Sequence, residues 1–164
     1  MHPAALRFVC AAAAQLPPDV AVYDIGSRNI NGSARQAFPF AKAYLGIDLV
    51  AGQDVDIVGD ATLYTPPFVP DVVVCCEVLE HTDAAGVLCE RAWSLLAPRG
   101  TLIASLAGPT RAPHSALDGG PLLLGEFYRN GTSALITEWC HAFIDVGIST
   151  SAERDDLYVI AHKG

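Results

Sequence analysis

The stretch DVVVCCEVLEHTD at residues 71–83 contains five consecutive apolar residues directly after its first aspartate. A short apolar run that is rich in valine predicts a strand buried on both faces of a sheet. A helix is expected over about 83–96, because a proline and a glycine soon follow and end it. The next apolar run, 101–105, predicts another strand parallel to the first. We therefore expect the strand at 71–76 to be central in a parallel sheet.

Strands and helices alternate on both sides of this unit, which is typical of a parallel sheet with right-handed crossovers. A polar turn at 150–156 separates the last two strands and makes them antiparallel. The expected strands are 20–25, 44–48, 55–58, 71–76, 101–105, 143–149 and 157–162. The sequence thus predicts an α/β fold with a doubly wound, mostly parallel seven-stranded sheet, a C-terminal antiparallel hairpin and helices on both faces.

Three further segments complete the predicted fold. A first helix is expected after Pro3, and another over 133–141. The segment 106–130 is rich in proline and glycine and predicts a long loop beside the carboxyl ends of the strands. Residues 1–164 contain no linker, repeat or low-complexity tract, so we expect one domain. The expected buried face of the first helix contains Leu6, Val9, Cys10 and Ala13.

The composition limits the partners that the chain is expected to bind. The formal net charge is −8, with only 10 lysines and arginines, so the long-range field repels polyanions and favours a small-molecule substrate over nucleic acid. Five cysteines, an odd number without CxxC spacing, favour reduced thiols and a cytoplasmic location. No run reaches the roughly 18 apolar residues of a membrane span. Whether the chain forms a homodimer is left open.

An acidic residue stands at or near the end of each of the first three predicted strands. Asp24 and Gly26 lie at the first, where a glycine lets the chain turn and a ligand approach the backbone. Asp48 ends the second, where its carboxylate can accept hydrogen bonds from both hydroxyls of a ribose. Asp60 follows the third and can accept a bond from an adenine amino group, while Leu49 offers the ring an apolar face. Because parallel strands end at one edge, these residues predict a nucleoside site.

Several segments resemble the class I S-adenosylmethionine (SAM) dependent methyltransferases over nearly the whole chain. They are VYDIGS (22–27), YLGIDL (44–49), VGDAT (58–62), DVVVCCEVLEHTD (71–83) and LAPRGTLIAS (96–105). The resemblance implies a Rossmann-like fold that binds SAM. The chain departs from the family at Arg28, where a second glycine is usual. The residues implied to bind the cofactor are Asp24, Gly26, Ser27, Arg28, Asn29, Asp48, Leu49, Asp60, Ala61, Cys76 and Glu77.

The run Glu77-Val78-Leu79-Glu80-His81 is an ExxEH pattern, in which two carboxylates and a histidine can converge after a strand end. It resembles the metal motif of the ubiquinone-pathway O-methyltransferases and of the small-RNA 3′-terminal 2′-O-methyltransferases, which add a histidine from the loop after the fifth strand. His114 is the candidate for that place. The resemblance implies Mg²⁺ or Mn²⁺ bound by Glu77, Glu80, His81 and His114. The pattern also resembles family members that bind no metal, so this alternative stays open.

Two residues of the long loop are candidate catalytic groups. His114 could act with Asp118 as a general-base pair instead of binding a metal. Tyr128, in the run EFYRNGT, resembles a residue that borders the pocket in some relatives. The alternatives are that the loop histidine is simply solvated and that the tyrosine is a packing anchor.

The sequence therefore favours a SAM-dependent methyltransferase that acts on an oxygen of a small hydroxylated molecule, with metal assistance left open. The 3′ end of an RNA is an alternative substrate. An NAD-dependent oxidoreductase is a second hypothesis, because a glycine turn and a ribose-binding acid serve both cofactors, but the chain lacks GxGxxG. A non-catalytic SAM-binding module is a third.

Overall fold

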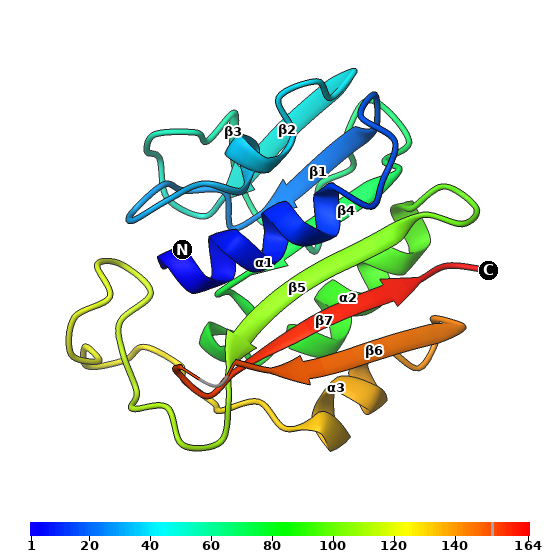
Figure 1. The fold of residues 1–164 in the computed structure, drawn as a ribbon. Coiled ribbons are helices and arrows are strands. Elements are labelled where there is room, and N and C mark those ends of the chain that lie inside the picture. Colours follow the sequence, from blue (N-terminus) through cyan, green and yellow to red (C-terminus); the bar gives the residue numbers. More distant parts are fainter. Residues whose placement is uncertain (152) are drawn as a thin grey trace.

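Strand β4 (Val72–Cys76) lies at the centre of the sheet. Within residues 1–151 and 153–164, which this computed structural model describes, seven strands form one sheet in the order β3-β2-β1-β4-β5-β7-β6 (Figure 1). Strands β1 to β5 pair in parallel, and β7 pairs antiparallel with both β5 and β6. The predicted fold class is confirmed. The other strands are β1 (Ala21–Ile25), β2 (Ala43–Asp48), β3 (Ile57–Val58), β5 (Thr101–Ala107), β6 (Asp145–Thr150) and β7 (Asp156–His162).

The alternation of side chains along β4 divides the core into two layers. Val73 and Cys75 face a layer that contains helices α2 (Ala85–Leu95) and α3 (Ser133–Trp139). The other β4 side chains face helix α1 (Pro3–Ala13) and the short 3₁₀ helix η1 (Ala34–Ala37) on the opposite side. Every residue of β4 is buried, as its continuous apolar run predicted. Figure 1 shows α1 on one side of the sheet and α2 with α3 on the other.

Helix α1 begins at a proline, and the ring of His2 caps its first turn by accepting a hydrogen bond from the Ala5 amide. Its buried residues are Ala5, Val9 and Ala12. The predicted buried face was therefore wrong at Cys10, which is exposed. The reason is that small alanine side chains let the helix lie close to the sheet, whereas the prediction gave weight to the larger apolar residues.

Element ends differ from the predicted ends by one or two residues. Strand β3 is shorter than 55–58 because Val55 closes a turn on the carbonyl of Gly52 and the Asp56 carboxylate accepts a bond from the Gly46 amide. Strand β5 runs on to Ala107, because its antiparallel pairing with β7 extends to Asp156. Both differences depend on partners that are distant in the sequence.

A long segment, 108–132, follows β5 and lies at the same edge of the sheet as the arrowheads of β1 and β5 (Figure 1). The amino-terminal end of α1 lies at this edge too. Within the part of the chain that the structure describes, none of the helices has the length and apolar character needed to cross a bilayer. The carboxyl edge of the parallel strands is thus where the loops gather.

Leu102→Ala tests the central core. Leu102 is only 1% exposed on β5 and packs in the layer beneath α2 and α3. We expect the variant to lower the free energy of unfolding by about 2–5 kcal/mol, because the removed methyl groups leave a cavity. Urea denaturation measures this. Leu124→Ala, at a fully exposed leucine, is the matched control and should change stability by less than about 0.5 kcal/mol; equal losses in the two variants would contradict the assignment.

Candidate functional site

A cavity of about 1050 Å³ opens at the carboxyl edge of the sheet. Its lining comes from the loops after β1, β2, β3 and β4, from residues 111–121 of the long loop, and from the first two residues of the chain. Asp48 and Asp60 both line it. The two carboxyl groups that follow adjacent strands β2 and β3 therefore share one hollow large enough for a nucleoside with a substituent.

The Asp48 carboxylate is held in place by backbone amides. Its Oδ1 accepts from Val50 N at 2.9 Å and its Oδ2 from Arg28 N at 3.3 Å. Each oxygen retains a second lone pair for a ligand hydroxyl. The neighbouring Leu49 side chain is 73% exposed and also lines the cavity. An anchored carboxylate beside an exposed apolar side chain is suited to a ribose with an attached base.

At the next strand end, Asp60 turns its Oδ1 toward its own loop. It accepts from Thr62 N at 2.8 Å and from Thr62 Oγ1 at 2.7 Å. The amide of Gly59 donates to Asp48 O at 2.9 Å, which ties the two loops together. Ala61 is buried and lines the cavity beside them. Asp60 Oδ2 makes none of these bonds, so it can accept one from a ligand.

Gly26 is the point where the loops after β1 and β4 meet. Its φ is +76°, and a Cβ atom there would lie 2.1 Å from Val78 Cγ2. Only glycine fits this place, both because of its left-handed backbone and because of the close contact. Its amide donates to Ile47 O at 2.8 Å. Gly26 lines the cavity where the crevice between these two loops begins.

Three residues predicted to touch the cofactor lie outside the lining of the main cavity. Asp24 is buried and accepts a bond from Tyr44 Oη at 2.7 Å; burial raises the pKa of its carboxyl to about 7. Ser27 is buried beside it, along a minor hollow. Asn29 donates to Asp54 Oδ2 at 2.9 Å and accepts from Gly32 N at 2.9 Å. These side chains shape the loop after β1, while Arg28 between them does line the cavity.

Cys76 and Glu77 line the cavity at the end of β4. Glu77 has a left-handed backbone with φ +59°, and its amide donates to Ser105 O at 2.8 Å. Its Oε1 accepts from Ser105 Oγ at 2.9 Å, and its Oε2 lies 3.5 Å from His2 Nε2. The Glu77 carboxylate therefore faces Ser105 on β5. Burial raises the pKa of the Cys76 thiol, so this side chain lines the cavity as an uncharged thiol.

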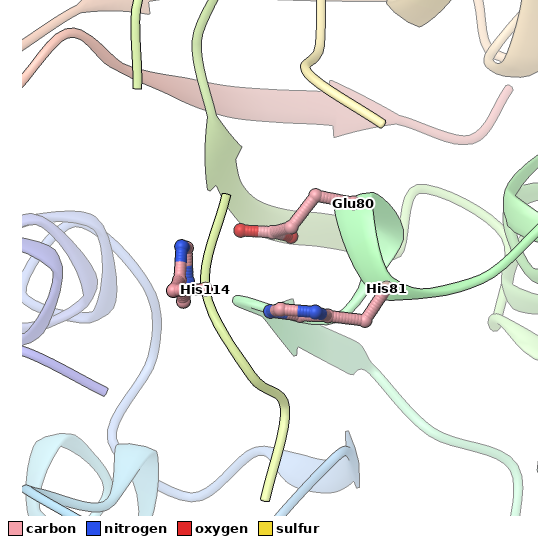
Figure 2. Close-up of side chains that lie close together, drawn as sticks. All are labelled: Glu80, His81 and His114. Carbon is pink, nitrogen blue, oxygen red and sulfur yellow. The ribbon is translucent and has the colours of Figure 1, made fainter. Parts of the chain in front are cut away.

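Glu80, His81 and His114 bring one ligand atom each within 4.8 Å of one another. Glu80 and His81 belong to the 3₁₀ helix η2 (Leu79–His81), and His114 comes from the long loop. Figure 2 shows the three side chains directed toward one common space. Of the four predicted metal ligands, the structure brings these three together, while Glu77 lies with Ser105 and His2 instead.

Two buried atoms of this group have no hydrogen-bond partner in the described structure, Glu80 Oε2 and His81 Nδ1. Glu80 is fully buried, and its Oε1 accepts from Ala107 N at 2.8 Å. Burial, with the nearby charge of Glu77, raises the pKa of Glu80. Burial and His114 lower the pKa of His81 to about 4. A cation would favour the ionised carboxylate and would satisfy both orphan atoms.

The two candidate catalytic residues of the loop pack against His81. The rings of His114 and Tyr128 lie 5.0 Å and 5.4 Å from the His81 ring, both edge to face. Burial raises the pKa of Tyr128 to about 12, so its hydroxyl keeps its proton at neutral pH. His114 Nδ1 lies 3.2 Å from Ala112 O, while Asp118 Oδ1 accepts from Gly120 N. The structure thus groups His114 with the other rings rather than with Asp118.

Sequence reasoning missed a buried ion cluster around Asp156, the first residue of β7. This side chain is completely buried, with His2 Nε2 at 2.8 Å from its Oδ2 and Arg111 Nε at 3.1 Å from its Oδ1. Arg154 lies farther away, at 3.8 Å. His2, Arg111 and Arg154 line the cavity. No local signal could have found this cluster, because its members come from both ends of the chain and from the long loop.

Solved structures of similar fold include three methyltransferases. The 1,6-didemethyltoxoflavin-N1-methyltransferase of Burkholderia thailandensis is 19% identical, with a TM-score of 0.71, over 98% of this chain and 78% of that chain. The N-methyltransferase NodS of Bradyrhizobium japonicum WM9 is 17% identical, with a TM-score of 0.65, over 99% of this chain and 85% of that chain. An S-adenosylmethionine dependent methyltransferase of Mesorhizobium loti is 18% identical, with a TM-score of 0.67, over 93% of this chain and 96% of that chain.

The fold is that of the class I SAM-dependent methyltransferases. The first two of these structures contain S-adenosylhomocysteine (SAH), the demethylated product of SAM. No family model matches the chain, and no curated protein does. Since the structural likeness stands at 17–19% identity, it establishes the architecture, and the argument for a function depends on the site.

Asp24→Asn tests the burial of the carboxyl beneath the β1 loop. The raised pKa means that folded Asp24 keeps a proton which the unfolded chain releases above about pH 4. The wild type should therefore lose stability relative to Asp24→Asn as the pH rises from about 4 to about 7, by at most about 1.4 kcal/mol per pH unit. Urea denaturation at several pH values measures this. A relative stability of the wild type that increases over this interval would show that Asp24 is ionised in the fold.

Proposed function

We propose that this chain is a SAM-dependent methyltransferase that acts on an oxygen of a small hydroxylated molecule. The observation that carries the proposal is the pair Asp48 and Asp60 on one cavity, at the ends of adjacent strands of a methyltransferase fold. This pair can recognise the two polar ends of an adenosine, the ribose hydroxyls and the adenine amino group. The SAH bound in two structures of the same fold supports the choice of cofactor.

The residues present fit the cofactor. Asp48 would hold the ribose, with Leu49, Asp60 and Ala61 around the adenine. The crevice between the loops after β1 and β4, lined by Gly26, Arg28, Cys76 and Glu77, would take the methionine portion. When bound, SAM supplies a methyl group on a positively charged sulfur. The chain needs to align an acceptor with that group and to exclude water, and much of the rate then comes from positioning.

Two features favour a small acceptor. Residues 111–121 and the first two residues of the chain line the cavity together with the strand-end loops, so it is bordered on several sides. The net charge of −8 opposes a polyanion, which makes the 3′ end of an RNA the weaker alternative. A hydroxyl acceptor is favoured over an amine because the neighbouring Glu80, His81 and His114 can serve a group that must lose a proton.

We further propose that Glu80, His81 and His114 bind a divalent cation. The specific observation is the pair of buried atoms without partners, Glu80 Oε2 and His81 Nδ1, beside a third ligand from the loop. Two imidazoles and one carboxylate favour manganese or another first-row ion over magnesium, which prefers oxygen ligands. A bound cation would lower the pKa of a hydroxyl placed next to it.

For the cofactor, we predict that the wild type binds SAH and does not bind NAD, measured by isothermal titration calorimetry. Asp48→Ala should weaken SAH binding about ten- to a hundredfold, because two charge-assisted hydrogen bonds to the ribose are lost. Asp19→Ala, at an exposed aspartate before β1, is the matched control and should bind as the wild type does. Binding of NAD without SAH would instead support the oxidoreductase.

Turnover separates an enzyme from a non-catalytic SAM-binding module. Methyl transfer from labelled SAM is measured with catechols, sugars and RNA ends as acceptors. We expect product with a small hydroxylated acceptor. SAH binding without turnover on any of these acceptors would support the module.

A further prediction concerns the cation. Titration with Co²⁺, followed by its visible absorption, should show one site in the wild type, which His81→Ala and His114→Ala abolish. Glu77→Gln should retain the site, because that carboxylate faces Ser105. His141→Ala, at an exposed histidine of another helix end, is the matched control. Equal Co²⁺ binding by the His81→Ala and His141→Ala variants would remove the proposed metal site.

A further inference from the structure

Arg28 joins two walls of the cavity that are far apart in the sequence. Its backbone amide donates to Asp48 Oδ2 at 3.3 Å, and its guanidinium donates through Nη2 to Leu117 O at 2.8 Å. The stem of its side chain crosses Gly52, where a Cβ atom would lie 2.9 Å from Arg28 Cγ. One residue thus connects the proposed ribose carboxylate to the long loop. It occupies the position where related loops usually have a glycine.

The part of the loop that Arg28 contacts is an internally bonded unit. Ser115 is buried, its amide donates to Gly120 O at 2.8 Å, and its hydroxyl donates to Glu126 Oε1 at 2.8 Å. The Leu117 amide donates back to Ser115 Oγ at 3.1 Å. Compact surface loops of this kind are held together by their own side chains. A displacement of Leu117 is therefore expected to move Ser115 and the residues bonded to it.

Few hydrogen bonds among the described residues join this unit to the rest of the chain. Asn130 closes the base of the loop through bonds to Gly108 O and Arg111 O. Among the hydrogen bonds of the described residues, Arg28 to Leu117 is the one that ties 112–126 to any part of the chain outside the loop. The ring of His114, 5.0 Å from the ring of His81, provides a second attachment. Because His114 is three residues from Leu117, both attachments act on the same short stretch.

We propose that Arg28 is a positioning residue that clamps the long loop across the nucleoside end of the cavity and thereby sets the place of His114. The inference rests on the proposed function for the identity of the nucleoside. It adds a connection between the two ends of the site: occupancy beside Asp48 stabilises the loop that carries an acceptor-side ligand. Such coupling is reciprocal in binding free energy, so a ligand on His114 also tightens the binding of the nucleoside.

Histidine NMR signals test the clamp without any ligand. Arg28→Met keeps the aliphatic stem over Gly52 and removes the donor to Leu117. The Hε1–Cε1 signals of His114 and His81 should shift, because their rings lie 5.0 Å apart and each senses the ring current of the other. Those of His141 and His162 should stay unchanged. Arg28→Lys, which retains a donor, should give signals nearer to the wild type. His114 and His81 signals in Arg28→Met identical to the wild type would overturn the proposal.

Release of SAH gives a second measurement, by stopped-flow displacement. Arg28→Met should release SAH about three- to tenfold faster, the range expected for losing one exposed, charge-assisted hydrogen bond. Arg99→Met, at an exposed arginine in the turn before β5, should release it at the wild-type rate. An unchanged rate in Arg28→Met overturns the clamp. Absence of SAH binding by the wild type defeats the proposed function, while the histidine signals still decide whether Arg28 positions the loop.

Discussion

The contact between Gly26 and Val78 is the constraint on which the cavity depends. Strand β1 is followed by a crossover toward β2, while β4 lies on the other side of β1, so the chain turns in opposite directions after these two neighbours. A crevice forms between such loops at the carboxyl edge of a doubly wound sheet. Gly26 lets the loops touch at its base, since any Cβ atom there would overlap Val78. Asp48 and Glu77 line the cavity on either side of this contact, together with Gly26 and Val78.

Two buried carboxyl groups at the acceptor end differ in how their charge is balanced. Asp156 has His2, Arg111 and Arg154 around it. Glu80 is equally buried but forms no ion pair in the part of the chain that the structure describes. A buried carboxylate without a cation is costly, and the raised pKa of Glu80 expresses that cost. The cation proposed above would supply a positive charge beside Glu80, where the described residues supply none.

The positions of the strands along the chain and of the acids at their ends were predictable from local sequence, because both follow from short-range rules. Apolar runs of four to six residues mark parallel strands, and residues that directly follow them must lie at the carboxyl edge. This is why Asp48 and Asp60 could be placed before the structure was known. Asp24 shows the limit of the rule: it is the next-to-last residue of β1, yet its buried carboxyl accepts a bond from Tyr44 and does not line the main cavity.

The acceptor end was much less predictable, because it is built from contacts over long sequence separations. His2, Arg111 and Asp156 come from three distant segments. The hydrogen bond from Arg28 to Leu117 likewise joins the loop after β1 to the loop after β5. Structures of this fold tolerate 17–19% identity, since strand ends can be held in register by many apolar sequences. A loop that is held by the hydrogen bonds of one or two side chains depends on those particular residues. We therefore expect cofactor recognition to depend on the sheet and the choice of acceptor to depend on residues 108–130 with the first turn of α1.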